Sequence, residues 1–460
     1  MPLSYGDALA AIQARGRFGI RLGLGRTRGL LRELGRPEET LRGALIGGTN
    51  GKGSVQALVA SVLRAAGRRV GQTPKPHLVS YRERIVVDDE PIAGHDFGAV
   101  VADVLAAAGR LPSRLGPPTE FELLTVAAFA WFARAGVEVA VVEVGLGGRL
   151  DATNAWDGGV AAVTNVELDH MDRLGSTREA IAREKAAIIK RGDRAVTGAS
   201  DPGLGVIRRR ARRMGVPLVE VSPLPLLAHD RGGLLVASSR LGPLRLGLLG
   251  RHQAHNAAVA LAVLEALAEA GIASADDDAT RRGLAAARWP GRLELLAVDA
   301  AGAARPADAS GPDPSAPDVL LDGAHNGSGA AALAAAVDEL RPSLSPGPVT
   351  LLLGLMGDKD VAAALRELAA SEALASAHVV TTTVDSPRAA TAEELAMAWR
   401  TATGAPARRG VRASAIDDPD AALSEALGRS RADGGPLVVA GSLYLVGRVR
   451  GRLVPGPHDA

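Results

Sequence analysis

Runs of apolar, β-branched residues alternate with Ala/Leu-rich helical patterns along the chain. Short apolar runs that end in Gly, Asn or Thr are typical of buried strands, whereas apolar residues every three or four positions predict helices. In the first half, the pattern predicts strands at 44–47, 138–144, 160–165 and 194–197, and helices at 55–66, 125–135 and 177–189. Such alternation predicts an α/β fold around a mainly parallel sheet.

The same alternation returns after residue 292. It predicts strands at 319–321, 349–353, 378–383 and 437–441, and helices at 329–340, 361–370 and 419–427. The segment 300–317 is rich in Ala, Gly, Pro and Asp without periodicity, which predicts a mobile surface loop. Because 460 residues exceed what one core usually organises, we expect two domains, 1–296 and 297–460.

Composition narrows the class of protein. Lys and Arg total 53 against 51 for Asp and Glu, and no basic block is interleaved with aromatic residues, so we expect no nucleic-acid partner. The basic run 208–213 lies on a helical pattern that ends at Gly215 and is interpreted as a solvated face. The absence of Cys excludes disulfides and thiolate metal sites. Residues 1–15 lack a signal-peptide core and no apolar run suits a membrane span, so we expect a cytoplasmic protein.

A glycine-rich segment, Gly48-Thr49-Asn50-Gly51-Lys52-Gly53-Ser54, separates the apolar run 44–46 from the helical pattern that begins at 55. Its glycines permit close backbone approach, the helix N-terminus attracts an anion, and Lys52 supplies a cation. The spacing differs from GxxxxGK[ST], because only two residues separate the first two glycines and Gly53 is additional. The segment predicts a nucleoside triphosphate site, with a glycine-rich strand-to-helix turn as the alternative.

Three more residues carry candidate chemistry. Glu143 is close to the end of the predicted strand 138–144, where a carboxylate suits Mg²⁺, although a capping or ion-paired glutamate is the alternative. His170 follows the predicted strand 160–165 and is either a metal ligand or a structural histidine. Lys185 lies in the predicted helix 177–189, where sequence physics alone indicates a surface lysine.

An ordered set of motifs runs through both halves of the chain. It comprises GGTNGKGS at 47–54, PHLVSYRERI at 76–85, EVGLGGRLDATN at 143–154, DHMDRLGST at 169–177, EKAAIIK at 184–190, GRHQAHNAA at 250–258, WPGRLE at 289–294, LLDGAHN at 320–326, LGLMGDKD at 353–360 and AGSLYLVG at 440–447. Each piece is short, but the ordered set resembles the folylpolyglutamate synthase/dihydrofolate synthase family, part of the Mur-type amide ligases.

The resemblance implies a fold and an activity. The fold would be an N-terminal P-loop mononucleotide-binding α/β domain with a folate-binding loop, followed by a smaller Rossmann-like domain for glutamate ligation. The activity would be ATP-dependent ligation of L-glutamate to a reduced folate, with dihydropteroate as a further candidate acceptor. An acyl phosphate would be the intermediate and Mg²⁺ the cofactor. The resemblance also favours a monomer.

The resemblance further implies roles for single residues. The expected ATP contacts are Thr49, Asn50, Gly51, Lys52, Gly53, Ser54, Asn256, Arg292 and Asp322. The expected metal ligands are Glu143, His170, Lys185 and Ser54. Lys185 would be carbamylated, because an ammonium cannot bind Mg²⁺ whereas a carbamate is an anionic oxygen ligand. Lys52, Lys185 and His170 form the expected catalytic set.

Substrate contacts are also implied. The expected folate contacts are His77, Leu150, Asp151 and Ala152, and the expected glutamate contacts are His325 and Ser442. One position departs from the family, which usually has Ser where this chain has Lys75 and uses that serine at the first metal site. Either another oxygen completes this site, from Ser54 or Thr73, or the Lys75 ammonium replaces part of the metal's charge.

Two other functions remain open at this stage. A Mur-type ligase for a cell-wall precursor is disfavoured because the segment before residue 47 is short for the additional nucleotide-sugar domain of such ligases. A P-loop switch protein would need nucleotide-controlled loops, whereas the motifs in the second half favour an enzyme with several substrates.

Overall fold

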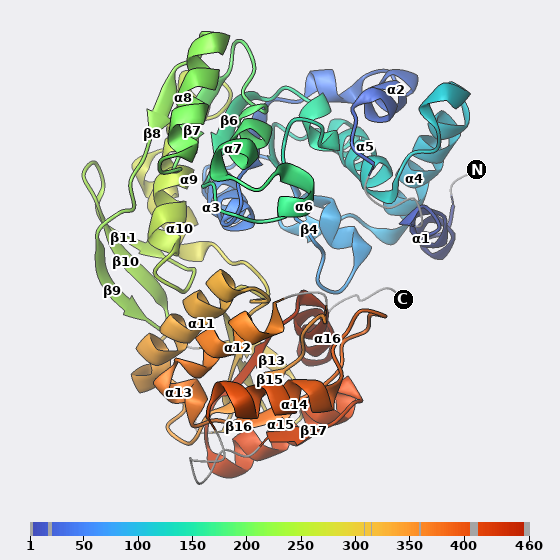
Figure 1. Cartoon of the computed structure of the whole chain (residues 1–460). Helices are drawn as coiled ribbons and strands as arrows, with labels where there is room; N and C mark the ends of the chain where they lie inside the picture. The colour runs from blue at the N-terminus through green and yellow to red at the C-terminus, as the bar shows by residue number, and fades with distance from the viewer. Residues whose placement is uncertain are drawn as a thin grey trace. The chain divides into compact units, whose positions relative to one another are not determined.

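The computed structural model describes residues 3–16, 21–307, 309–313, 315–357, 360–404 and 413–454. The chain divides into two compact units, the first comprising Met1–Leu224 and Ala254–Ala287 and the second comprising Pro225–Gln253 and Arg288–Ala460. Each unit has an α/β architecture around its own sheet (Figure 1). The predicted α/β fold is therefore confirmed. Among the described residues, no helix has both the length and the apolar character to cross a membrane.

The sheet of the first unit has the strand order β4-β3-β2-β5-β1-β6-β7-β8. Its strands are β1 (Gly43–Gly47), β2 (Val70–Thr73), β3 (Val86–Val87), β4 (Glu90–Pro91), β5 (Val139–Glu143), β6 (Gly159–Val163), β7 (Arg194–Thr197) and β8 (Leu218–Glu220). In this order, the six strands β2-β5-β1-β6-β7-β8 are parallel, and β3 and β4 extend the sheet beyond β2 as antiparallel strands. The carboxyl ends of β2, β5, β1 and β6 therefore share one edge of the sheet.

Helices pack around this sheet. They are α1 (Tyr5–Gln13), α2 (Gly25–Glu33), α3 (Lys52–Ala65), α4 (Gly94–Gly109), α5 (Glu120–Arg134), α6 (Met171–Leu174), α7 (Arg178–Ala186), α8 (Gly203–Met214), α9 (Gln253–Glu269) and α10 (Asp277–Ala286), with short 3₁₀ helices at Pro37–Thr40, Tyr81–Arg84, Ser113–Leu115 and Ala152–Ala155. α10 lies against α3 (Figure 1), where the Ser61 hydroxyl donates to the Gly283 carbonyl at 2.8 Å. The basic run 208–213 lies on α8, which ends at Met214, so the predicted helix end at Gly215 is confirmed; Gly215 itself has a left-handed conformation.

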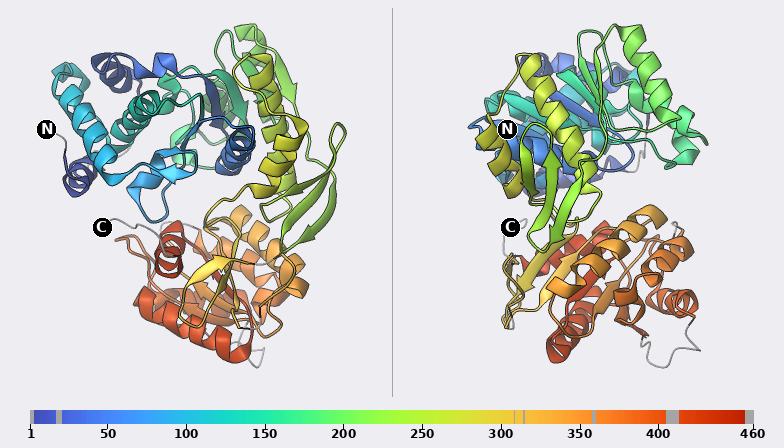
Figure 2. Two further views of the ribbon diagram at one scale, coloured as in Figure 1. Left: turned by 180° about the vertical axis from the view of Figure 1, so that it is seen from behind. Right: turned by 90° about the vertical axis from the view of Figure 1, so that its left-hand side faces the viewer.

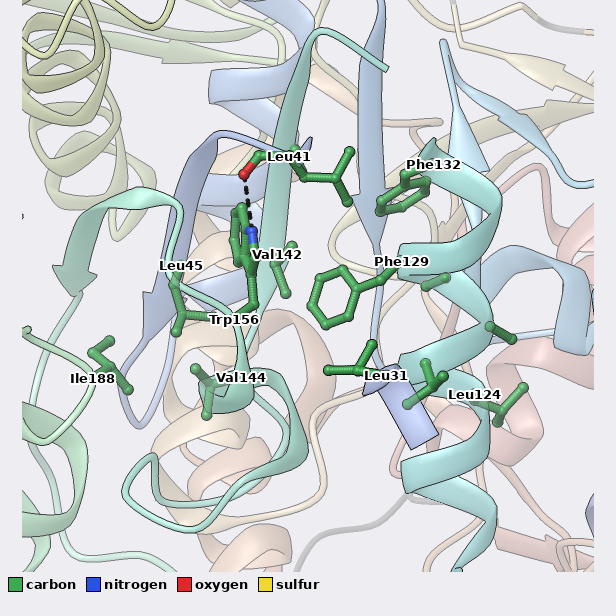
Figure 3. Close-up of a cluster of buried hydrophobic side chains, with 14 of the residues drawn as sticks. Leu31, Leu41, Leu45, Leu124, Phe129, Phe132, Val142, Val144, Trp156 and Ile188 are labelled. Atoms are coloured by element: carbon green, nitrogen blue, oxygen red, sulfur yellow. Dashed lines mark hydrogen bonds between the residues drawn. The ribbon is translucent and has the colours of Figure 1, made fainter. Parts of the chain in front are cut away.

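The core of the first unit is built from apolar faces of the sheet and of α5. Figure 3 shows Phe129 beside Trp156, whose ring centroids are 5.6 Å apart, with aliphatic side chains around them. The buried Trp156 indole donates to the Leu41 carbonyl at 3.1 Å, so its polar atom is satisfied inside the core. Burying these large side chains fixes β1 and β5, which bear the candidate site at their ends.

The second unit holds two sheets. A parallel run, β14-β18-β15-β16-β17, is extended antiparallel by β12 and β13 in the order β13-β12-β14-β18-β15-β16-β17. The strands are β12 (Glu294–Val298), β13 (Ala304–Pro306), β14 (Asp318–Leu321), β15 (Thr350–Leu353), β16 (His378–Thr381), β17 (Ala413–Ala415) and β18 (Leu437–Ala440). A small antiparallel sheet has the order β11-β10-β9, with β9 (Leu226–Asp230), β10 (Gly233–Ser238) and β11 (Gly242–Leu246).

The helices of the second unit are α11 (Gly327–Leu340), α12 (Val361–Ala369), α13 (Glu372–Ala375), α14 (Ala392–Ala402), α15 (Pro419–Asp433) and α16 (Leu443–Leu453), with a 3₁₀ turn at Arg341–Ser343. The antiparallel strands run beside α11 (Figure 2), and His229 of β9 pairs with Glu339 of α11 at 2.6 Å. A buried ion pair between Arg231 and Asp318 also ties the small sheet to this unit.

The segment 300–317 is not simply a loop. Ala304–Pro306 forms β13, which pairs antiparallel with β12, so the prediction of a loop throughout is wrong. The missing periodicity is explained by length, because a three-residue edge strand buries too little to leave a hydrophobic pattern. The proposed domain boundary at 296/297 stays a prediction; the compact units group 225–253 and 288–296 with the C-terminal part.

A carboxyl pair lies before β6 and β7, at the amino edge of the first sheet. Asp193 is buried and accepts the Lys190 backbone N–H at 2.7 Å. The pKa of Asp193 is raised to about 7, chiefly by burial and also by the charge of Asp157 and a hydrogen bond with it, while the Lys190 N–H and charge oppose the shift. The folded protein therefore holds a proton on this pair that the unfolded chain releases near pH 4.

Asp193→Asn should make the protein more stable at alkaline pH. Because the folded pKa of Asp193 is raised, its contribution to stability is full below about pH 4 and is lost as pH rises through 7. The asparagine amide supplies an N–H to Asp157 in place of the shared proton, and this N–H does not titrate. The difference in free energy of unfolding between Asp193→Asn and the wild type, in favour of the variant, should therefore be roughly 1–3 kcal/mol larger at pH 8 than at pH 5. Urea unfolding at both pH values measures this. Asp278→Asn, at a highly exposed carboxyl, should show no such pH dependence; an Asp193→Asn difference independent of pH would contradict the assignment.

Candidate active site

The glycine-rich loop joins the central strand β1 to α3. β1 is fully buried between β5 and β6, and α3 begins at Lys52, directly after Gly51 in a left-handed conformation with φ of 80°. No side chain caps α3 at Gly51. The helix N-terminus, with its partial positive charge, therefore faces the end of the loop, as an anion site requires.

Side chains that follow β6 hold this loop in shape. The Asn165 Oδ1 accepts the backbone N–H groups of Thr49 and Asn50 at 3.1 and 2.9 Å, and the Thr164 hydroxyl donates to the Asn50 carbonyl at 2.6 Å. Gly48 has a φ of 146°, and a Cβ there would lie 1.8 Å from Thr164 Oγ1. The loop is thus preformed, and only glycine fits at 48.

The first turn of α9 packs against the same loop. A Cβ on Gly51 would lie 2.2 Å from Asn256 Oδ1, so this buried amide is in contact with the loop backbone. His255 Nε2 lies 3.1 Å from the Thr164 carbonyl. The structure therefore brings Asn256, a predicted ATP contact, to the glycine-rich loop 48–54, the P-loop of this chain.

Two ammonium groups meet at one carbonyl of the loop. Lys185 Nζ donates to the Gly48 carbonyl at 2.7 Å, and Lys52 Nζ donates to the same oxygen at 3.2 Å and to the Thr49 carbonyl at 3.0 Å. Lys185 is buried, so the surface position that bare sequence physics indicates is wrong. It lies on the face of α7 that also buries Ile181 and Ala182, one turn away.

The environment of Lys185 weakens its charged form. The pKa of Lys185 is lowered to about 7, chiefly by burial and also by the nearby charge of Lys52, while the charge of Asp169 opposes the shift. A large fraction of this amine is therefore neutral near physiological pH. In the described part of the chain neither Lys52 nor Lys185 forms an ion pair with a carboxylate, which suits a site for an anion or for chemical modification of the amine.

Lys75 approaches the same region from the end of β2. Its Nζ donates to the Glu143 carbonyl and, at 3.3 Å, to the Thr73 hydroxyl. Burial lowers the pKa of Lys75 to about 8, with Asp151 and Glu143 opposing that shift and Arg84 and Lys52 adding to it. The ammonium therefore points inward, beside the candidate site.

Glu143 is the last residue of β5 and is buried next to the P-loop strand, opposite Ile46 in the parallel register. His170 is half-exposed, has a φ of 48° and precedes α6, with its Nε2 3.7 Å from Asp169. In the described ranges, no group of three or more His, Cys, Asp or Glu side chains is gathered for a metal ion. The predicted set contains only two such side chains, Glu143 and His170.

The donor types nevertheless suit Mg²⁺. Glu143 supplies a buried carboxylate and Ser54 a buried hydroxyl on α3, both at the carboxyl edge of the sheet. Hard oxygen donors are the ligands that Mg²⁺ takes. The Thr73 hydroxyl already accepts hydrogen bonds from the Glu143 N–H, at 3.2 Å, and from Lys75 Nζ. Thr73 therefore holds the end of β5 in place and is a less suitable metal ligand than Ser54.

A cavity of about 200 Å³ opens beside this edge. It is lined by Arg21, Leu22, Gly23, Thr119, Phe121, Glu122, Gly145, Leu146, Leu150, Asp151 and Ala152. Three predicted folate contacts, Leu150, Asp151 and Ala152, are among these residues. Asp151 uses its carboxylate to accept the N–H groups of Leu146 and Thr153 at 2.9 and 3.0 Å, so it also shapes the cavity wall.

His77 lies outside this lining. Arg84 Nε donates to His77 Nδ1 at 2.7 Å, and the His77 and Tyr81 rings are 4.2 Å apart. Phe121 is not among the residues predicted from the sequence, and the fold brings it to the cavity from the first turn of α5. A signal was available, because Thr119 and Glu122 form a capping box that marks where this helix begins.

The remaining predicted residues follow strands of the second unit. Asp322 comes directly after β14 and accepts the N–H groups of Leu293 and Ala324, each at 2.8 Å. Burial raises the pKa of Asp322, while the Arg292 charge opposes the shift. His325 Nδ1 lies 2.8 Å from the Gly323 carbonyl. The structure therefore brings Arg292 close to Asp322, and His325 follows Asp322 by three residues.

Ser442 follows β18, the parallel neighbour of β14. Its hydroxyl accepts the Tyr444 N–H at 3.1 Å and caps α16. Because β14 and β18 run parallel, His325 and Ser442 lie after the same edge of the sheet. The motif at 353–360 is described only in part, since Asp358 and Lys359 lie outside the described residues.

Comparisons with known proteins cover the same two regions. The Mur ligase middle domain matches residues 46–264, and the Mur ligase glutamate ligase domain matches residues 312–443. Dihydrofolate synthase/folylpolyglutamate synthase of Bacillus subtilis is 33% identical over 460 residues, which cover 98% of this chain and 99% of that protein. The chain belongs to the folylpolyglutamate synthase/dihydrofolate synthase family.

Other members of this family agree in sequence and in structure. Dihydrofolate synthase/folylpolyglutamate synthase of Mycobacterium tuberculosis is 36% identical, over 93% of this chain and 89% of that protein. A crystal structure of Mycobacterium tuberculosis folylpolyglutamate synthase complexed with ADP and AMPPCP has a TM-score of 0.81 at 34% identity, covering 97% of this chain and 98% of that one. The predicted family is confirmed, and neither the cell-wall ligase nor the P-loop switch protein is supported.

Proposed function

We propose that this protein is an ATP-dependent ligase that joins L-glutamate to the carboxylate of a folate-type substrate. The observation that carries the proposal is the pairing of Lys52 and Lys185 on the Gly48 carbonyl, beside a cavity walled by residues 150–152. The family membership supplies the reaction class, because near full-length relatives are named for folylpolyglutamate and dihydrofolate synthesis. Reduced folates are the proposed acceptors, and dihydropteroate is a second one.

The first step transfers a phosphoryl group. A carboxylate oxygen of the folate-type substrate attacks the γ-phosphorus of ATP, the bond to the β–γ bridging oxygen breaks, and ADP leaves with that oxygen. The N-terminus of α3 and Lys52 offset negative charge on the transferring group. We propose that Lys52 leaves the Gly48 and Thr49 carbonyls when phosphate arrives, because a phosphate oxygen is the stronger acceptor.

The second step forms the amide. The uncharged α-amine of L-glutamate attacks the acyl carbon, the carbon–oxygen bond to phosphate breaks, and the nitrogen loses a proton to solvent. Phosphorylation has made phosphate a good leaving group, so no side-chain nucleophile is needed. We assign His325 and Ser442 to glutamate binding, since both follow parallel strands at one edge of their sheet.

Mg²⁺ is the expected cofactor, and it supplies positive charge that offsets the ATP phosphates. Glu143, Ser54, His170 and carbamylated Lys185 would hold it. In carbamylation, the neutral Lys185 amine attacks CO₂, a nitrogen–carbon bond forms as one C=O π bond breaks, and a proton is released, leaving a carbamate whose single negative charge is shared by two oxygens. Burial of Lys185, with its pKa near 7, supports this proposal because only the neutral amine reacts.

The other assignments complete the proposal. The phosphate contacts are Thr49, Asn50, Gly51, Lys52, Gly53 and Ser54, and the further ATP contacts are Asn256, Arg292 and Asp322. His77, Leu150, Asp151 and Ala152 are assigned to the folate substrate. We also propose that the protein is a cytoplasmic monomer.

ATP consumption should require both other substrates. Phosphate release from ATP and Mg²⁺ should appear only when L-glutamate and either dihydropteroate or a reduced folate are present, because the acyl phosphate needs an acceptor and an amine. Lys52→Ala should lower this rate by roughly 10²-fold or more with the fold intact. A malachite-green phosphate assay and circular dichroism measure both. Rapid ATP turnover without a folate-type acid would contradict the proposed function.

Lys185→Ala should be inactive, and acetate or propionate should restore part of the rate by replacing the carbamate oxygens. Wild-type protein equilibrated with ¹³C-bicarbonate, Mg²⁺ and a non-hydrolysable ATP analogue should show a carbamate signal in ¹³C NMR that Lys185→Ala lacks. Lys190→Ala is the matched control, because its Nζ also donates to a backbone carbonyl, that of Trp156, and it should keep the signal. A wild-type spectrum without the signal would overturn carbamylation.

A further inference from the structure

Lys75 sits between the ends of two neighbouring strands, β2 and β5. Its ammonium donates to the Glu143 carbonyl and to the Thr73 hydroxyl, the last residues of those strands. The Phe121 ring lies on another side, with its centroid 5.3 Å from Lys75 Nζ. The lysine is therefore fixed in place by the fold.

The surroundings of Lys75 join two parts of the candidate site. Phe121 and Asp151 line the cavity, whereas Lys52 belongs to the P-loop, and each lies near enough to act on the Lys75 ammonium. Glu143 and Asp151 face it with negative charge, and Lys52 and Arg84 with positive charge. Lys75 thus stands where a carboxylate held in the cavity would approach a phosphate held on the loop.

The hydrogen-bond count leaves Lys75 one donor. An ammonium carries three N–H groups. The Glu143 carbonyl and the Thr73 hydroxyl accept two of them, and no third acceptor is present among the residues that the structure describes. A neutral side chain would suffice to tie the strand ends together without the cost of burying a charge. The charges of Glu143 and Asp151 offset part of this cost, and the remaining N–H of Lys75 is left to bind a ligand.

We propose that Lys75 is a further catalytic residue, whose remaining N–H binds the substrate carboxylate while that carboxylate attacks the γ-phosphorus. This inference rests on the proposed function. The ammonium brings two negative groups together by offsetting their repulsion, and it keeps its proton throughout. The carboxylate oxygen that does not attack is the acceptor, so the nucleophilic oxygen keeps its electron pair for phosphorus.

The test compares Lys75→Met and Lys75→Gln in the full chain. Methionine removes charge and donors, whereas glutamine keeps an N–H for the Glu143 carbonyl without the charge. Glutamate-dependent phosphate release should fall about 100-fold in kcat for Lys75→Met, with a smaller loss for Lys75→Gln. Affinity for a non-hydrolysable ATP analogue should be unchanged in both. Lys190→Met, the control at a lysine outside the site, should keep the wild-type kcat.

Two results would overturn the inference. Wild-type kcat in Lys75→Gln would show that only the contact with the strand ends matters. Loss of affinity for the ATP analogue in both folded variants, confirmed by unchanged melting temperatures, would assign Lys75 to nucleotide binding instead. Absence of glutamate-dependent phosphate release in the wild-type protein would instead contradict the proposed function. The two failures are distinguishable, because the Lys75 comparison is made only against an active wild type.

Discussion

The carbonyl of Gly48 is the point on which the candidate site depends. It accepts from both Lys52 and Lys185, and this is possible because glycine at 48 lets the chain pass against Thr164. The charge of Lys52 disfavours the protonated form of Lys185, and burial makes that repulsion stronger. The positive charge at the N-terminus of α3 therefore favours a nearby negative group, whether phosphate, a metal-bound carboxylate or a carbamate.

The parallel sheet brings the polar and charged groups of the candidate site to one place. β2, β5, β1 and β6 end at one edge, so Thr73, Glu143, Gly48 and Thr164 come together although they are far apart in sequence. The hydrophobic packing around Trp156 and Phe129 holds β1 and β5 in register (Figure 3). Polar chemistry at the edge is thus supported by an apolar core that takes no part in it.

Local sequence patterns predicted several strands and helices of the first unit. The elements and site residues that were missed depend on contacts between segments that are distant in sequence. β7 has the predicted bounds, and β1, β5 and α3 differ from prediction by a few residues, because each carries its own period and ends at polar residues or glycine. β9 to β11 and β13 were missed, since short antiparallel strands depend on partners rather than on their own pattern. The burial of Lys185 and the place of Phe121 beside Lys75 likewise arise only when distant segments pack.

A crystal structure of the full chain with Mg²⁺ and a non-hydrolysable ATP analogue would show directly whether the Gly48 loop binds phosphate. The Gly48 and Thr49 carbonyls hold Lys52 at the place where the ATP phosphates are proposed to bind. We expect Lys52 Nζ to leave the Gly48 and Thr49 carbonyls and to bind oxygens of the β- and γ-phosphates, with the phosphates at the N-terminus of α3. Phosphates bound elsewhere, or Lys52 still bonded to its own loop beside a bound nucleotide, would contradict this expectation.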